Sequence, residues 1–123
     1  MNVKEYQNQI LKLCTDTPFI SDFNLTFEEI DEHTCYISGV LDLIDSSSLY
    51  VSEYIEVQIQ AKCLKYRFHW QNKDKSLIAR WDNVPHYKDI STSPYHLHEG
   101  EKILPSQEMN FSLIIKEIGN RLI

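Results

Sequence analysis

The run CLKYRFHWQ, residues 63–71, constrains the fold more than any other stretch because apolar and polar side chains alternate along it. Leu64, Tyr66, Phe68 and Trp70 share one face of an extended chain, and the residues between them share the other. A strand of this kind has one face in a core and one in water. The pattern therefore predicts an antiparallel sheet that is covered on one side.

The segment SLIARWDNV follows the turn-forming NKDK and supplies a partner for this strand. The apolar strip of the first strand needs apolar neighbours on the second. Leu77, Ala79 and Trp81 supply them if the two strands pair so that the two residue numbers of each opposed pair have an odd sum. In that register the polar face brings four side chains together: Arg67, His69, Arg80 and Asp82.

Apolar residues at helical spacing predict one helix from about Val3 to Cys14 and another from about Asn110, a candidate N-cap, to Leu122. Residues 34–44 and 49–59 resemble a hairpin, residues 19–30 fit a strand better than a helix, and EGEKILPSQ is a loop or a short strand. We expect an α+β fold, an antiparallel β-meander of about four to five strands with both helices packed on one face.

Charge is distributed unevenly along the chain. The net charge is −6, but residues 62–88 carry seven basic and two acidic side chains, a local net charge of +5. A local basic strip attracts phosphate even on an acidic protein, because the field at a surface depends on nearby charges. A solvated hairpin face explains the same strip equally well.

Several classes of protein are not supported by the sequence. The start of the chain lacks the apolar run of a signal peptide, and no apolar run approaches the roughly 20 residues of a membrane helix, so we expect a cytoplasmic protein. The three cysteines are widely spaced without a CxxC, which favours buried thiols over disulfides or a cysteine zinc site.

The stretch RWDNVPHYKDISTSPYHLH, residues 80–98, is called the histidine segment below. A first interpretation is a metal site in which His96 and His98 are joined by His86 or Asp82, leaving an open position for zinc or manganese. The spacing matches no established zinc motif, so we favour a protein without a metal cofactor.

A second interpretation is acid–base chemistry on a phosphodiester. His69, His86, His96 and His98 can exchange protons near neutral pH, Arg67 and Arg80 can hold a phosphate, and Tyr66, Tyr95 or Trp81 can stack on bases. A third interpretation assigns no chemistry: Asn83 bonds the backbone, Pro85 ends the strand, and the histidines cap carbonyls or line a surface for a protein partner.

The histidine segment and the strand before it resemble the TumE-type toxins of bacterial and archaeal toxin–antitoxin modules. The resemblance covers about residues 36–118 and rests on three groups: Tyr66, Phe68 and Trp70; Arg80, Trp81, Asp82, Asn83, Pro85 and His86; and Pro94, Tyr95, His96 and His98. Two positions depart from the family pattern, Asp45-Ser46-Ser47 where Asp-Gly-Ser is usual and Tyr95 where His is frequent.

The resemblance implies one TumE-like domain over residues 1–123. It implies a toxin that is neutralised by a cognate antitoxin, often a helix-turn-helix protein. By analogy with other small toxins of such modules, we expect it to cleave RNA or to inhibit translation in another way. The resemblance implies catalytic roles for Arg80, Asp82, His86, His96 and His98. We expect substrate contacts for Lys65, Arg67 and His69 from the basic strip and the polar strand face, and for Trp81 and Tyr95 by stacking on bases. The resemblance adds Glu53, which aligns with the family's usual acidic position.

Overall fold

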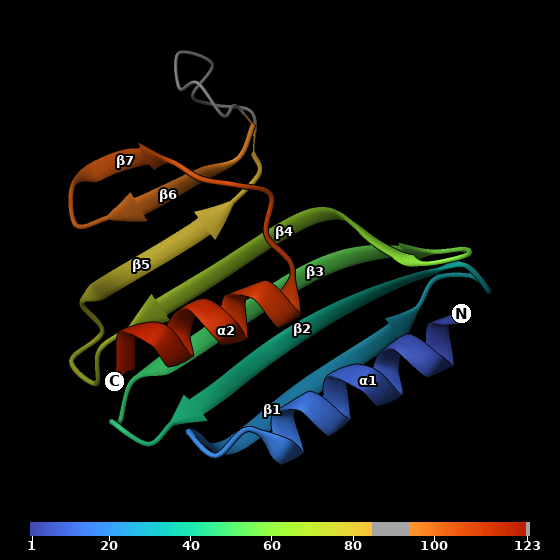
Figure 1. The fold of residues 1–123 in the computed structure, drawn as a ribbon, viewed down its shortest axis with the longest axis horizontal. Helices are drawn as coiled ribbons and strands as arrows, with labels where there is room; N and C mark the ends of the chain where they lie inside the picture. Colours follow the sequence, from blue (N-terminus) through green and yellow to red (C-terminus); the bar gives the residue numbers. More distant parts are fainter. Residues whose placement is uncertain (85–93, 123) are drawn as a thin grey trace.

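The computed structural model describes residues 1–84 and 94–122, and within these ranges the chain forms two helices and seven strands (Figure 1). The elements follow the order α1 (Val3–Asp16), β1 (Ile20–Glu29), β2 (Thr34–Leu43), β3 (Ser48–Val57), β4 (Ala61–Gln71), β5 (Leu77–Asp82), β6 (His96–Glu99), β7 (Lys102–Pro105) and α2 (Phe111–Leu122).

The strands form one antiparallel sheet in which spatial order equals chain order, from β1 to β7. This confirms the predicted meander, but the expected number of four to five strands was wrong. The additional strands are short: β6 and β7 have four residues each and are joined through Gly100, whose φ of 58° suits a tight hairpin turn.

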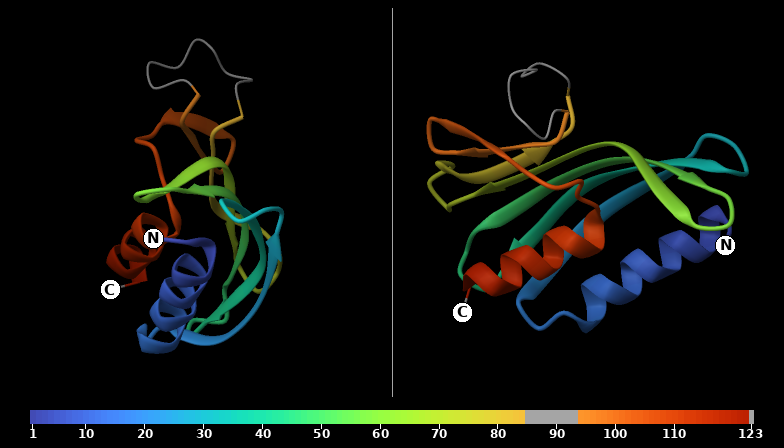
Figure 2. Two further views of the ribbon diagram at one scale, coloured as in Figure 1. Left: turned by 90° about the vertical axis from the view of Figure 1, so that its right-hand side faces the viewer. Right: turned by 45° about the horizontal axis from the view of Figure 1, so that its top comes forward.

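Both helices pack on the same face of the sheet, which we call the inner face (Figure 2, left). The side chain of Asn2 caps α1, and Asn110 Oδ1 accepts a hydrogen bond from the amide of Leu113 at 2.9 Å, which confirms the predicted N-cap of α2. Alternate residues of β1 to β5 lie in the core between helices and sheet or pack against it, as period 2 requires, and β6 contributes Leu97.

The predicted register between β4 and β5 is confirmed. Phe68 lies opposite Trp81 and Trp70 opposite Ala79, all four in the core, while Arg67 lies opposite Asp82 and His69 opposite Arg80 on the outer face. Each of these pairs adds to an odd number.

Two residues that were expected in the core lie outside it. Leu77 pairs with Gln71 after a register shift between Trp70 and Gln71, and Ile78 packs against the core instead. The register of β3 and β4 shifts between Tyr54 and Ile55, whose partners are Lys65 and Cys63, so Leu64 is the extra residue of a bulge. Leu64 is 40% exposed, and Cys63 packs against the core in its place. Among the described residues no helix is long and apolar enough to cross a membrane.

Candidate functional site

Two rows of polar side chains cross the outer face of strands β4, β5 and β6. The first row consists of His69, Arg80 and His98, and the second of Arg67, Asp82 and His96, each residue lying directly opposite its neighbour in the row. Directly opposed residues of antiparallel strands point to the same face. The fold therefore brings six of the predicted site residues together from strands β4, β5 and β6.

Asp82 is the centre of this cluster. One carboxylate oxygen, Oδ1, lies 2.6 Å from His96 Nε2 and accepts a hydrogen bond from the amide of Val84 at 3.1 Å. The other, Oδ2, lies 3.7 Å from both Arg80 Nε and His98 Nε2. Because Asp82 is 2% exposed, its charge acts on these neighbours with little screening by water.

His96 is held from both sides of its ring. Nε2 contacts the carboxylate of Asp82, and Nδ1 lies 2.9 Å from the backbone carbonyl of Pro94. Contacts at both nitrogens fix the orientation of the ring. Because His96 is also buried, this geometry favours a positioning role over contact with a substrate.

The two histidines of the first row have a different environment. Burial lowers the pKa of both His69 and His98, and the positive charge of Arg80 is the second-largest cause in each case. Asp82 opposes this effect at His98. Both rings are therefore poised to accept a proton near neutral pH, and they lie on either side of the same arginine.

Arg80 has an unused donor. Its Nε is buried and finds no hydrogen-bond acceptor in the described part of the chain, since the nearest Asp82 oxygen is 3.7 Å away. A buried guanidinium donor without an acceptor is costly. The Arg80 side chain as a whole is 29% exposed, so its exposed part is open to an anionic ligand. Arg67, exposed in the neighbouring row, adds a second planar cation beside this position.

One potential metal-ligand atom from each of Asp82, His96 and His98 lies within 4.8 Å of the other two, so these three residues can hold a metal ion. This is one of the two predicted sets, the one in which Asp82 is the third ligand; His86, the third ligand of the other set, lies outside the described residues. The Nδ1 contact of His96 with a carbonyl is common among metal-bound histidines. An ion would nevertheless have to replace the hydrogen bond between His96 and Asp82.

Three predicted substrate-contacting residues lie on the inner side of the sheet. Trp81 is buried beneath Arg121, whose guanidinium carbon is 5.4 Å from the ring centroid, and Tyr95 packs against the core. Glu53 is fully buried and accepts hydrogen bonds from the hydroxyl of Tyr6 and the amide of Phe111. Lys65, by contrast, is exposed on the outer face with Arg67.

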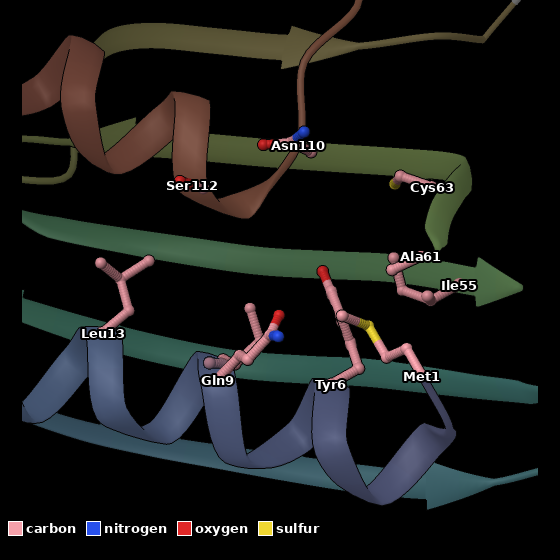
Figure 3. A pocket seen from close by; sticks show the side chains of 10 residues that line it. Met1, Tyr6, Gln9, Leu13, Ile55, Ala61, Cys63, Asn110 and Ser112 are labelled. Atoms are coloured by element: carbon pink, nitrogen blue, oxygen red, sulfur yellow. The ribbon is translucent and has the colours of Figure 1, made fainter. Parts of the chain in front are cut away.

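A pocket on the inner side has Tyr6, Cys63 and Asn110 among its lining residues and lies between α1, the sheet and the start of α2 (Figure 3). Tyr6 extends from α1 across the sheet. The sheet itself separates this pocket from Asp82 and the two rows. The pocket is therefore not part of the cluster.

The sequence did not identify the neighbours that orient His69. Gln71 Oε1 lies 3.2 Å from His69 Nε2, and the ring of Tyr50 meets the imidazole edge-on with 6.5 Å between centroids. The register of β3 against β4 places Tyr50 opposite His69. This pair could have been predicted from the sequence only if the bulge in β4 had been known, because the bulge shifts the register by one residue.

Asn83 acts as the sequence predicted. Its Oδ1 accepts a hydrogen bond from the amide of Tyr66 and its Nδ2 donates to the carbonyl of Leu64, both at 3.0 Å. These contacts extend the pairing of β4 with β5 one residue beyond Asp82, and so they fix the end of the strand that carries Arg80 and Asp82.

The family model described as Toxin TumE matches residues 10–122, nearly the whole chain. No curated protein and no solved structure matches the chain. The matched range contains α2, all seven strands and both rows of the cluster. The chain therefore belongs to the TumE family, which makes it the toxin component of a toxin–antitoxin module whose partner is a cognate antitoxin.

Proposed function

We propose that this toxin cleaves RNA by general acid–base catalysis, with His69 and His98 transferring protons and Arg80 binding the phosphate between them. The order of the first row carries this proposal, because a cation with an unused donor is flanked on adjacent strands by two histidines of lowered pKa. Neighbouring strands are about 4.8 Å apart, so the backbones of the two histidines are separated by about 10 Å.

The reaction needs two proton transfers at one phosphate. One histidine removes the proton of the 2′-hydroxyl, whose oxygen attacks phosphorus, and the other protonates the departing 5′-oxygen. The products are a 2′,3′-cyclic phosphate and a 5′-hydroxyl end, with no other reactant consumed. Arg80, and Arg67 beside it, stabilise the charge that develops on the phosphate oxygens.

Asp82 and His96 support this site without touching the reacting atoms. Asp82 bonds His96 and faces both Arg80 and His98, so it orients the two groups through electrostatic contacts. His86 remains a predicted catalytic residue outside the described ranges, and His86→Ala belongs in the same assays.

The test is cleavage of a short single-stranded RNA by the purified toxin. We expect fragments that end in 2′,3′-cyclic phosphate, and we expect no cleavage when every ribose lacks its 2′-hydroxyl. Activity should persist after treatment with a chelator. Cleavage of the all-deoxy strand, or fragments with a 3′-hydroxyl, would exclude the proposed chemistry, and the absence of any cleavage would favour a toxin that acts only by binding a partner.

A metal-dependent hydrolase is a second candidate, favoured by the grouping of Asp82, His96 and His98. It predicts about one zinc or manganese ion per chain by elemental analysis and loss of activity with chelator. His69→Ala separates the two mechanisms, because His69 is a proton donor or acceptor in the first and is not a ligand in the second.

The cognate antitoxin is proposed to be a helix-turn-helix protein encoded beside the toxin gene. Its support is the resemblance of the histidine segment to TumE-type toxins. Co-expression of the neighbouring gene should relieve growth arrest caused by the toxin. Persistent arrest despite a soluble product of that gene would contradict the pairing.

A further inference from the structure

Next to the cluster, the outer face of β2, β3 and β4 carries a row that neither the family assignment nor the proposed chemistry uses. Tyr36 lies opposite Tyr54, and Tyr54 lies opposite Lys65. These side chains share the outer face with Arg67, two residues further along β4. The row is therefore continuous with the cluster.

The two tyrosines line a groove. Tyr36, Ser52, Tyr54 and Lys65 form its walls, and we call it the tyrosine groove. A second depression, lined in part by Ser52, Lys65, Arg67 and Val84, adjoins it and shares two of these residues. A path over the surface thus leads from Tyr54 to Arg67, which is the neighbour of Asp82.

The tyrosine rings are half-buried, and one of them is fixed. The hydroxyl of Tyr36 lies 2.7 Å from Ser52 Oγ, close enough for a hydrogen bond that holds the ring over the small serine. Ring faces held in this way bind flat aromatic ligands with little loss of side-chain entropy.

Charge gives the groove a direction. Lys65 and Arg67 lie at its end near the cluster, and residues two apart on a strand are about 6.7 Å apart. Acidic side chains of the same face, Glu28 and Glu56, lie beyond the tyrosines, away from Arg80. An anionic chain is therefore attracted to the side of the groove that meets the site.

We propose that the tyrosine groove binds unpaired bases of single-stranded RNA beside the phosphate that is cleaved. Tyr54 and Tyr36 stack on the bases, and Lys65 and Arg67 contact the backbone phosphates. The position of the cleaved phosphate in this inference rests on the proposed function. A duplex is a poor ligand because its base faces are stacked inside the helix and cannot reach the rings.

The test measures binding in a His98→Ala background, which removes a proposed proton-transfer group, so that the RNA stays intact. Fluorescence anisotropy with oligouridylate, oligoadenylate and a duplex of the same length gives the dissociation constants. We expect Tyr54→Ala to weaken binding of the single strands about tenfold, and Tyr54→Phe, which keeps the ring, to retain affinity.

Two further variants test the inference even if the Tyr54→Ala protein does not fold. Lys65→Ala, at an exposed position, should lower the slope of log affinity against log salt concentration by about 0.7, as expected for one lost phosphate contact with a single strand. Thr26→Ala, on the same face of β1, is the matched control and should bind as the parent does.

Equal affinity for single strand and duplex, or single-strand binding by a folded Tyr54→Ala protein as tight as the parent's, would overturn this inference. If the Tyr54→Ala toxin cleaves RNA with the same Michaelis constant as the wild-type toxin, the inference about the tyrosine groove is overturned and the proposed function is left intact. Tyr54-dependent binding by a protein that cleaves no RNA would do the opposite: the groove would stand and the catalytic assignment would fall.

Discussion

His98→Ala is expected to lower the rate of RNA cleavage by about 10²–10⁴-fold, the usual contribution of a general acid or base. The same loss is expected for His69→Ala, because the two rings perform the two proton transfers of one reaction. Since His98 is mostly buried and faces Asp82, its removal also takes away one of the polar neighbours of the Asp82 carboxylate. His69 has no contact of this kind with Asp82 in the structure, so its variant reports the proton transfer more directly.

The dependence of the rate on pH gives this prediction a second measurement. Acid–base catalysis by two histidines requires one neutral and one protonated ring, which produces a bell-shaped profile. Both His69 and His98 have a pKa below the ordinary value of 6.5, so the maximum should lie on the acidic side of pH 6.5. Each single variant should lose one limb of the bell.

His33→Ala is the matched control, because His33 is exposed in the turn between β1 and β2. It should cleave RNA with the wild-type rate and pH profile. Growth arrest on expression gives the same comparison in cells. If folded His69→Ala and His98→Ala proteins cleave RNA as fast as His33→Ala does, the first row is not the catalytic site.

The polar face of β4 and β5 was predictable because a sheet repeats every two residues. Once Phe68 and Trp70 required apolar partners, only registers with an odd sum remained, and these place His69 and Arg80 on the same face. The structure shows that the two residues are directly opposite each other. Joining His96 and His98 to this face required the family resemblance, because nothing in residues 83–95 specifies how the chain returns. The structure adds the reason: β6 pairs with β5 in the register that places His98 opposite Arg80.

Trp81 and Tyr95, predicted to contact the substrate, lie on the inner side of the sheet, away from the two rows. Trp81 stands between Arg80 and Asp82, so the alternation that exposes its neighbours on the outer face turns its ring towards α2. Motif proximity suggested a substrate contact for Trp81 and Tyr95, although side chains adjacent in a strand point to opposite faces. The strand number was underestimated because β6 and β7 are too short to show a periodic pattern.

Glu53 leads to the second large prediction. It is fully buried on the inner side of β3, where Tyr6 of α1 donates to one carboxylate oxygen at 3.2 Å and the amide of Phe111 in α2 donates to the other at 3.3 Å. The carboxyl thus joins both helices to the sheet. Burial raises its pKa to about 7, although hydrogen bonds from Cys63, Tyr6 and Phe111 act in the opposite direction.

The sign of the pH dependence follows from this shift. In the folded protein Glu53 binds a proton more tightly than in the unfolded chain, where its pKa is near 4.5. Its contribution to the free energy of unfolding is therefore fully present below about pH 4.5 and is lost as the pH rises through about 7. The difference in pKa corresponds to a loss of about 3 kcal/mol.

Glu53→Gln removes this titration while keeping a side chain that can accept from Phe111 and donate to Tyr6. We expect the free energy of unfolding of the variant, relative to wild type, to rise by about 3 kcal/mol between acidic and alkaline pH. Urea denaturation of both proteins at pH 5 and pH 8 measures most of this relative change, and differences in the remaining groups cancel between them.

Glu56→Gln, three residues along the same strand and on the outer face, is the control and should not reproduce the change. A Glu53→Gln protein that is destabilised by the same amount at both pH values would mean that the carboxyl acts there as a constant hydrogen-bond acceptor. A relative gain confined to alkaline pH would identify Glu53 as a buried charge that weakens the junction of α1, β3 and α2 whenever its proton is lost.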